Sequence, residues 1–254
     1  GGCFVIKLEK DRLAELEAAV VKLCFYEQPI FAVDNEDTEG KLQEYELLLR
    51  EAGEDNKFPA ALFKEYIRNN ESNRIFCNWM ANELKELVKN KPNQYFSFNI
   101  DPQQLLYPST IEALKALIPY QKTLMVEITE AIPSKRYFDQ YYNNSMIEPI
   151  KQVHDLGFRI AIDDVSSGMN SFNIVREYGK YIDRIKLSLL QLRNVSKDLV
   201  QETVMLWRSM AIDNQIDLII EGIDNLSVSD WLVDNSIKLQ QGYYWGRPQA
   251  IEKN

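Results

Sequence analysis

Acidic and amide side chains recur at one place in the sequence pattern, inside a short apolar run or directly after it. Asp163 and Asp164 follow the run 158–162, and Lys186 lies within the run 182–187. A charged side chain at such a position is costly to bury unless a counter-charge or a metal ion compensates it. One such residue is ordinary, but the pattern recurs in most of the runs. The other residues placed in this way are Glu46, Asn99, Asp101, Glu127, Glu221 and Gln241.

The residue types limit the chemistry that these side chains can perform. His154 is the only histidine, which excludes a histidine-based triad and a multi-histidine zinc site. Cys3, Cys24 and Cys77 have no Cys-x-x-Cys spacing and indicate reduced thiols. Several carboxylates in one place repel each other unless divalent cations neutralise them, and oxygen ligands suit Mg²⁺ or Mn²⁺. The sequence therefore favours metal-assisted hydrolysis of a phosphoester, with one or two ions.

Composition sets further bounds. The chain has 254 residues and a formal net charge of −9, which argues against broad electrostatic binding to DNA or to acidic membranes. No apolar run approaches the roughly 20 residues of a membrane-spanning helix. The first residues, from Gly1 to Phe4, lack the basic and apolar regions of a signal peptide. We therefore expect a soluble, cytoplasmic protein that does not bind DNA and has no membrane segment in this chain.

Short apolar or β-branched runs alternate with helical patterns. Apolar spacing predicts helices over residues 10–23, 109–117, 145–156 and 197–214. Strands that alternate with helices indicate βα units and a mostly parallel sheet. About eight units in about 250 residues are typical of a closed (β/α)₈ barrel, and a doubly wound open sheet is the alternative. The predicted strands are 24–33, 45–49, 95–100, 124–128, 158–162, 182–187, 218–220 and 239–245.

The composition along the chain indicates how many domains it forms. We see no low-complexity linker and no sharp change of composition, so we expect one domain over residues 1–254, with 1–9 as a tail or a cloning remnant. The acidic segment 34–40 is expected to form a surface turn. In a barrel, the carboxyl ends of the strands converge on the face where active sites lie. The polar residues above should meet on that face.

Eight short stretches occur in the order of a known family. They are Gln28-Pro29-Ile30, Glu46-Leu47-Leu48-Leu49-Arg50, Asn99 within FSFNIDPQQL, VEITE with Glu127 and Glu130, IAIDD ending in Asp163 and Asp164, Asp183-x-x-Lys186, Glu221-Gly222-Ile223, and Gln241-Gly242-Tyr243 leading to Pro248. On these stretches the chain resembles, from about Leu13 to Pro248, the EAL-domain cyclic di-GMP phosphodiesterases of bacteria. The resemblance implies an α/β, TIM-like (β/α)₈ barrel, often with an irregular first strand. It also implies opening of cyclic di-GMP to linear pGpG with Mg²⁺ or Mn²⁺.

The resemblance also implies a role for each matching residue. Lys186 would position or polarise the hydrolytic water, and Glu221 would be the base-side carboxylate. Glu130 would anchor the loop that carries Asp163. The implied metal ligands are Glu46, Asn99, Glu127 and Asp163 for the first ion and Asp164 for the second, and the implied substrate-binding residues are Gln28, Leu48, Arg50 and Gln241.

The chain departs from the family pattern at three places. The signature Glu-Ala-Leu reads Glu46-Leu47-Leu48, which keeps the carboxylate. The family's Asp-Asp-Phe-Gly loop, which connects metal binding to dimer contacts, reads Asp163-Asp164-Val165-Ser166. The family's Lys-x-Asp reads Lys186-Leu187-Ser188. Because a neutral hydroxyl is a weaker ligand than a carboxylate, we expect a weakened second metal site.

Two kinds of function follow from this comparison. The retained acids favour an active phosphodiesterase. Ser188 and the altered loop after Asp164 favour instead a degenerate domain that binds cyclic di-GMP, or a protein partner, without turnover. Another phosphoester substrate on the same barrel is a further alternative. The protein contact that the resemblance implies is a homodimer through the loop after Asp164.

Overall fold

The strands and helices alternate along the chain. The computed structural model describes residues 2–37, 39–53, 57–131, 146–165 and 172–252. Its helices are α1 (Gly2–Val20), α2 (Ala60–Tyr66), α3 (Asn70–Asn90), α4 (Pro108–Leu117), α6 (Ile147–Asp155), α7 (Phe172–Tyr178), α8 (Lys197–Asn214) and α9 (Leu226–Asp234). Its strands are β1 (Leu23–Ala32), β2 (Lys41–Glu51), β3 (Phe96–Ile100), β4 (Leu124–Ile128), β5 (Arg159–Ile162), β6 (Arg184–Ser188), β7 (Asp217–Glu221), β8 (Leu239–Gln241) and β9 (Gln249–Ala250).

In the described part of the chain, eight strands close into a barrel. They follow one another in the order β2 to β8, and β1 pairs with both β8 and β2 to complete the ring. Strands β2 to β8 run parallel, whereas β1 is antiparallel to both of its neighbours. The predicted barrel is therefore confirmed, with the reversed β1 as its irregular first strand, and the open sheet is excluded.

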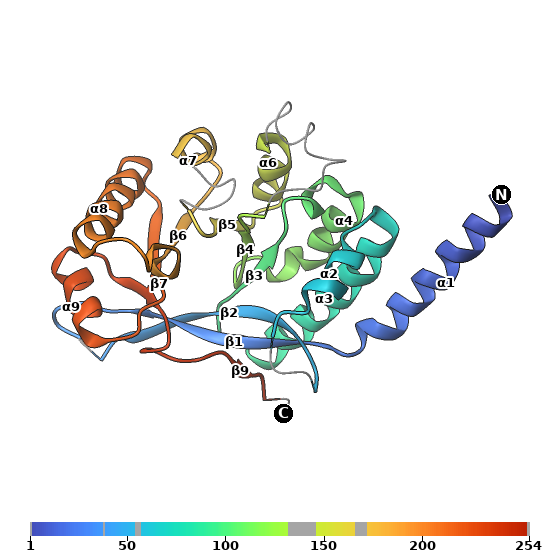
Figure 1. Cartoon of the computed structure of the whole chain (residues 1–254), viewed down its shortest axis with the longest axis horizontal. Coiled ribbons are helices and arrows are strands. Elements are labelled where there is room, and N and C mark those ends of the chain that lie inside the picture. Colours follow the sequence, from blue (N-terminus) through green and yellow to red (C-terminus); the bar gives the residue numbers. More distant parts are fainter. Residues whose placement is uncertain (1, 38, 54–56, 132–145, 166–171, 253–254) are drawn as a thin grey trace.

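The helices lie outside this barrel. Helices α2, α3 and α4 cover one side of the strands and α8 and α9 cover another, while α1 extends away from the body (Figure 1). The core between the strands and the helices contains fully buried side chains such as Phe98, Leu114 and Trp207. Tyr66, at the end of α2, ties α1 to α2 by donating its hydroxyl hydrogen to the backbone oxygen of Leu16, 2.8 Å away. No helix among the described residues is long and apolar enough to cross a membrane.

Short polar side chains set the beginnings of several helices. The side chain of Asn69 accepts a hydrogen bond from the backbone N–H of Ser72 at 3.0 Å and starts α3. Asn225 does the same for Val228 at the start of α9. Such caps satisfy N–H groups that have no partner within the helix. In the described part of segment 34–40, Asp34 Oδ1 accepts hydrogen bonds from the backbone N–H groups of Glu36 and Asp37, as in a turn.

Most predicted elements lie within a few residues of their observed positions, and the deviations have local causes. Helix α8 coincides with the prediction 197–214. Helix α1 begins at Gly2, inside the segment expected to be a tail, and ends at Val20. The predicted strand 239–245 stops at Gln241 because the chain turns at Gly242. A Cβ atom on Gly242 would lie 2.2 Å from the backbone oxygen of Ile223, so only glycine fits this close approach.

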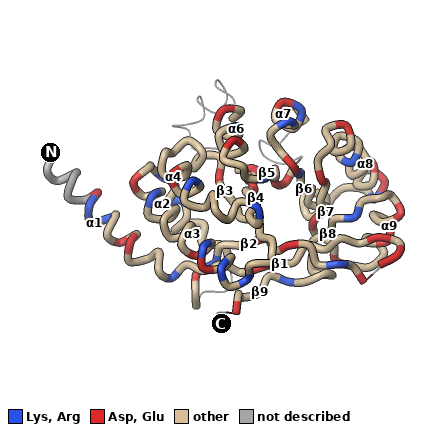
Figure 2. Tube along the Cα trace, turned by 180° about the vertical axis from the view of Figure 1, so that it is seen from behind, with Lys and Arg blue, Asp and Glu red and all other residues tan. Residues whose placement is uncertain are grey.

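The charged residues on the outside are mixed. On most of the outer helices Lys and Arg lie among Asp and Glu, whereas α9 carries acidic residues alone (Figure 2). Several of them form exposed ion pairs, such as that of Lys89 with Glu86 at 2.8 Å. Exposed pairs of this kind contribute little to stability. The charges that matter for the site lie inside the barrel.

Candidate active site

The pleat of the strands sends alternate side chains into the barrel. On β2, Glu44, Glu46, Leu48 and Arg50 share one face, and Leu47 and Leu49 pack outward into the apolar core. The parallel register sets Glu46 beside Ser97 of β3, and Asn99 of β3 beside Glu127 of β4. The strands therefore carry polar side chains to the carboxyl-end face, as the sequence predicted.

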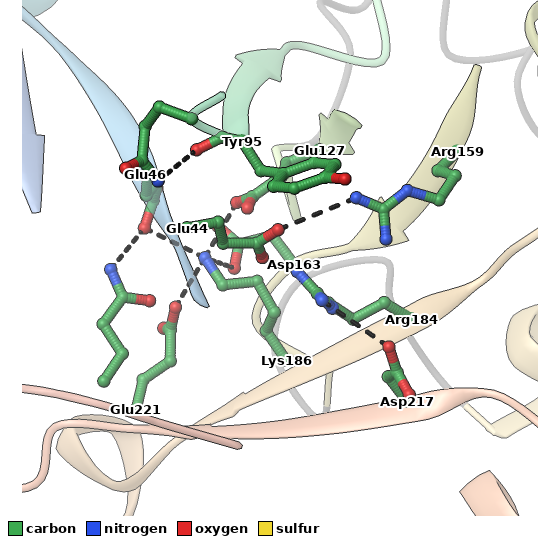
Figure 3. A network of polar contacts seen from close by, with 12 residues as sticks. Glu44, Glu46, Tyr95, Glu127, Arg159, Asp163, Arg184, Lys186, Asp217 and Glu221 are labelled. Atoms are coloured by element: carbon green, nitrogen blue, oxygen red, sulfur yellow. Dashed lines mark hydrogen bonds and ion pairs between the residues drawn. The ribbon is translucent and has the colours of Figure 1, made fainter. Parts of the chain in front are cut away.

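Lys186 lies at the centre of these side chains. It comes from β6, has no solvent exposure, and its Nζ is ringed by four carboxylates from four other parts of the barrel (Figure 3). The distances from Nζ are 3.0 Å to Glu46 Oε2, 2.8 Å to Glu127 Oε2, 3.4 Å to Asp163 Oδ1 and 2.6 Å to Glu221 Oε1. Five residues predicted for the site are thus in one network.

Glu46 connects this network to two amides. Asn99 Nδ2 donates to Glu46 Oε1 at 2.9 Å, and Gln241 Nε2 donates to Glu46 Oε2 at 2.8 Å. Burial alone would raise the pKa of Glu46, but Lys186 and the two amide donors outweigh it and hold that pKa below its usual value. Glu46 is therefore the acid of this cluster that is most firmly held as a carboxylate.

The other acids of the cluster carry more negative charge than Lys186 neutralises. Burial and the neighbouring Glu46 raise the pKa of Glu127 to about 7, against the attraction of Lys186. Burial, together with nearby carboxylates, also raises the pKa of Asp163 and of Glu221. Four carboxylates around one ammonium leave a negative site that favours further cations or protons.

The donor set fits one hard divalent cation. The side-chain oxygens Asn99 Oδ1 and Gln241 Oε1 are buried and accept no hydrogen bond among the described residues. Together with the carboxylates of Glu46, Glu127 and Asp163, they offer oxygen ligands of the kind that Mg²⁺ and Mn²⁺ prefer. As the side chains stand, with Lys186 between them, no three described His, Cys, Asp or Glu residues converge in the geometry of a ready metal site.

Asp164 lies apart from this ring. Its backbone is left-handed, with φ of 44°, and its Oδ2 accepts a hydrogen bond of 3.3 Å from Gln191 Nε2. Ser188, where the family pattern has an acid, is buried and brings no charge. Of Asp164, Gln191 and Ser188, only Asp164 is anionic. The set of ligands for a second cation is therefore poorer than the set for the first.

A cavity of about 350 Å³ opens beside the acidic ring. Its walls include all four residues predicted to bind substrate, which are Gln28, Leu48, Arg50 and Gln241. Arg50 Nε is buried and has no hydrogen-bond partner among the described residues, so this guanidinium retains a donor for an anion. Sequence reasoning missed other residues of the wall, namely Leu190, Arg193, Asp224, Tyr243 and Pro248. Tyr243 and Pro248 belong to the stretch that begins at Gln241, and that position in the sequence was their usable signal.

Glu130 lies outside the ring. It lines a separate, largely apolar cavity of about 260 Å³ together with Asn99 and Asp101. Burial and the nearby charge of Glu130 raise the pKa of Asp101 to about 6. The loop 166–171, which Glu130 was expected to anchor and which was expected to carry a dimer contact, lies outside the described residues. Both expectations therefore stay predictions.

A second polar layer lies below the first, towards the amino ends of the parallel strands. Glu44 pairs there with Arg184, and Arg159 NH2 lies 3.8 Å from Glu44 Oε2 (Figure 3). Arg184 also lies 3.5 Å from Asp217. Glu44 is two residues before Glu46, so the same face of β2 serves both layers. Sequence reasoning missed Glu44, although its spacing from Glu46 was a usable signal. Residues at this end of a barrel serve stability.

We expect Glu44→Gln to lower the free energy of unfolding by about 3 kcal/mol, because it leaves the buried Arg184 with the more distant Asp217 alone. Urea unfolding measures this loss. The carboxyl-end cavity should keep its shape in the folded variant, since Glu44 does not line it. An unchanged unfolding midpoint would show that the lower layer is not a structural ion pair.

A closed barrel with acids, amides and a lysine at the carboxyl ends of its strands places the chain among barrel proteins whose site lies on that face. The family profile described as "EAL domain" matches residues 13–248, and the chain belongs to this family. The family expected from the sequence is therefore confirmed.

Curated relatives are distant. The probable cyclic di-GMP phosphodiesterase PdeG of Escherichia coli K12 is 23% identical over 177 residues, which are 67% of this chain and 33% of the relative. The cyclic di-GMP phosphodiesterase PdeB of Shewanella oneidensis is 31% identical over 110 residues, 41% of this chain and 12% of the relative. The aligned part of this chain spans a third or less of the length of these relatives.

Solved structures share the fold. A standalone EAL protein from Vibrio cholerae O395, in its cyclic di-GMP-bound form, is 25% identical with a TM-score of 0.62, covering 89% of this chain and 92% of that one. An EAL domain protein from Listeria monocytogenes is 18% identical with a TM-score of 0.69 and 93% coverage of both chains. The manganese and cyclic di-GMP complex of Klebsiella pneumoniae BlrP1 is 20% identical with a TM-score of 0.65, covering 89% and 56%.

Proposed function

We propose that this domain hydrolyses cyclic di-GMP to linear pGpG with the help of a divalent cation. The observation that carries the proposal is the ring of four carboxylates around Lys186, with two amides bound to Glu46, beside a cavity that contains Arg50. Relatives named as cyclic di-GMP phosphodiesterases and the cyclic di-GMP complex of the Vibrio cholerae protein support the choice of substrate.

The cavity would hold the substrate by its phosphates. The planar guanidinium of Arg50 can bind a phosphate through two parallel hydrogen bonds, which an ammonium cannot do. Gln28 is held by the hydrogen bond from its Nε2 to the backbone oxygen of Gly246, at 3.2 Å, and so presents a fixed amide to the same cavity. Leu48 and Gln241 complete the contact surface.

The cation would be held by Glu46, Asn99, Glu127 and Asp163, and Asp164 would contribute to a second one. The manganese complex of BlrP1 supports this use of a divalent metal. When bound, Mg²⁺ or Mn²⁺ would lower the pKa of a water molecule and stabilise the leaving oxygen. Lys186 would move within its ring of acids and orient the water by hydrogen bonding.

Glu221 would take the proton of the attacking water. Its position at the end of β7 puts it on the wall of the cavity and 2.6 Å from Lys186 Nζ. Burial raises the pKa of this carboxyl, which brings its basicity closer to neutral pH and suits proton transfer. The water oxygen would form a bond to phosphorus as the phosphorus–O3′ bond of the ring breaks. The proton that Glu221 accepted would pass through solvent to the leaving O3′, which gives linear pGpG with a free 3′-hydroxyl and restores the carboxylate.

Incubation with cyclic di-GMP and Mg²⁺ or Mn²⁺ tests the proposal. Bound nucleotide and released pGpG are followed together, in the wild type and in Glu46→Ala. We expect pGpG from the wild type only. Binding without product would identify a receptor on an enzyme's fold, and no binding at all would point to a protein partner.

A receptor is the second candidate, because Ser188 brings no charge and Gln191 already donates to Asp164. If the poorer second site limits turnover, Ser188→Asp should raise metal-dependent hydrolysis by about tenfold or more, since a second cation stabilises the leaving oxygen. Initial rates over a range of Mn²⁺ concentrations measure the effect. An unchanged rate in a normally folded variant would exclude this explanation.

We propose that residues 1–254 form one domain, that it works in the cytoplasm, and that it does not bind DNA. A homodimer through the loop after Asp164 is proposed as its protein contact. Analytical ultracentrifugation, with and without cyclic di-GMP, measures whether two copies associate.

A further inference from the structure

The wall of the barrel is incomplete beside the cavity. Strand β1 pairs with β8 only over Ile30–Ala32 and Leu239–Gln241, and it pairs with β9 at Tyr26 and Glu27. Between these two pairings, residues 242–248 leave the sheet, form a turn and return as β9. This turn therefore lies across the gap in the wall, and Gly242, Tyr243 and Pro248 line the cavity there.

The backbone of the turn is held firmly. The N–H of Tyr244 donates to Ile223 O at 3.0 Å, and the N–H of Gly246 donates to Gly242 O at 3.0 Å. Trp245 is anchored by a hydrogen bond of 3.1 Å from its Nε1 to Gln240 Oε1 and by stacking on Phe31. The position from which Tyr243 projects is thus fixed before any ligand arrives.

Tyr243 is the only aromatic side chain among the described residues that line the cavity. The residue is 58% exposed, so much of it is open to solvent. The guanidinium of Arg247 lies over the ring, 4.1 Å from its centroid. A cation over an aromatic face is an attractive arrangement, and here it restricts the ring without covering all of it.

We propose that Tyr243 is the stacking platform for one base of the nucleotide, and that Arg247 positions its ring. This inference rests on the proposed function, because it takes a cyclic dinucleotide as the ligand. A base offers a flat π-face that stacks on an aromatic ring at the edge of a site. A ring held in place by Arg247 loses less freedom on binding, which favours affinity.

The experiment uses two probes, cyclic di-GMP and an analogue in which 2-aminopurine replaces one guanine. Stacking on tyrosine quenches 2-aminopurine fluorescence, which a merely structural side chain would not do. We expect Tyr243→Leu to bind either probe about 5- to 100-fold more weakly and to lose the quenching, whereas Tyr243→Phe keeps both. If the domain hydrolyses cyclic di-GMP, Tyr243→Leu should raise KM and leave kcat unchanged.

Arg247 and Tyr244 provide the comparisons. Arg247→Met should weaken binding about two- to fivefold, and Arg247→Lys should restore part of it. Tyr244→Leu removes a neighbouring exposed tyrosine that does not line the cavity, and it should bind like the wild type. Unchanged affinity or unchanged quenching in Tyr243→Leu would overturn this inference alone. Failure of the wild type to bind cyclic di-GMP would overturn the proposed function, and this inference with it.

Discussion

Glu221→Gln is expected to lower kcat for cyclic di-GMP by about 100- to 10,000-fold, the usual contribution of a general base. Glutamine keeps the size of the side chain and its hydrogen bonding to Lys186 but cannot accept a proton from water. Binding should change much less, because Glu221 is one of several residues that line the cavity. Single-turnover release of pGpG, measured at saturating nucleotide, separates the two effects.

The matched control for this variant is Glu86→Gln, an exposed glutamate on α3 that pairs only with Lys89 among the described residues. It should have wild-type turnover. A turnover of Glu221→Gln close to that of Glu86→Gln would remove Glu221 as the base. Loss of nucleotide binding in Glu221→Gln, with a normal fold, would instead make Glu221 a binding residue.

Lys186→Met is expected to lower the free energy of unfolding by about 5 kcal/mol at pH 7, the upper part of the range for breaking a buried ion pair. The variant leaves Glu46, Glu127, Asp163 and Glu221 facing each other with no cation between them. Urea unfolding in the presence of a chelator measures the loss. Lys89→Met, on the surface of α3, should be neutral.

The deficit of Lys186→Met should shrink as the pH falls. Glu127 already has its pKa raised from 4.5 to about 7 in the folded protein, so its protonated form stabilises the fold below about pH 4.5, and this stabilisation is lost as the pH rises through about 7. Removing Lys186 removes the attraction that holds the pKa of Glu127 down. The pH range in which protonated Glu127 stabilises the fold therefore extends to higher pH. A deficit that is the same at pH 5 and at pH 8 would contradict the electrostatic account.

Much of the site was predictable because strand ends in a barrel meet on one face. Glu46, Glu127, Asp163 and Lys186 were each placed by a local pattern, an acid or a lysine in an apolar run, and closure of the barrel brought them together. Arg193 gave no such signal, since it lies in an exposed segment after β6. Its place on the cavity wall depends on how that segment folds back, which spacing along the chain does not encode.

The limits of elements were harder to predict where tertiary contacts decide them. The apolar run 239–245 has the composition of one strand, but the chain leaves the sheet at Gly242, where it packs closely against Ile223. The lower layer was missed for a related reason. Glu44 is in a polar part of β2, and only the approach of Arg184 from β6 shows why it is buried.

The reversed direction of β1 decides from which side the chain enters the barrel. In an all-parallel barrel the first strand starts at the face opposite the site. Here Leu23, the first residue of β1, pairs with Glu51 at the carboxyl end of β2, so α1 joins the barrel on the site's own face. Five residues further on, Gln28 lines the cavity. A displacement of α1 would therefore reach the mouth of the site through the first residues of β1 alone.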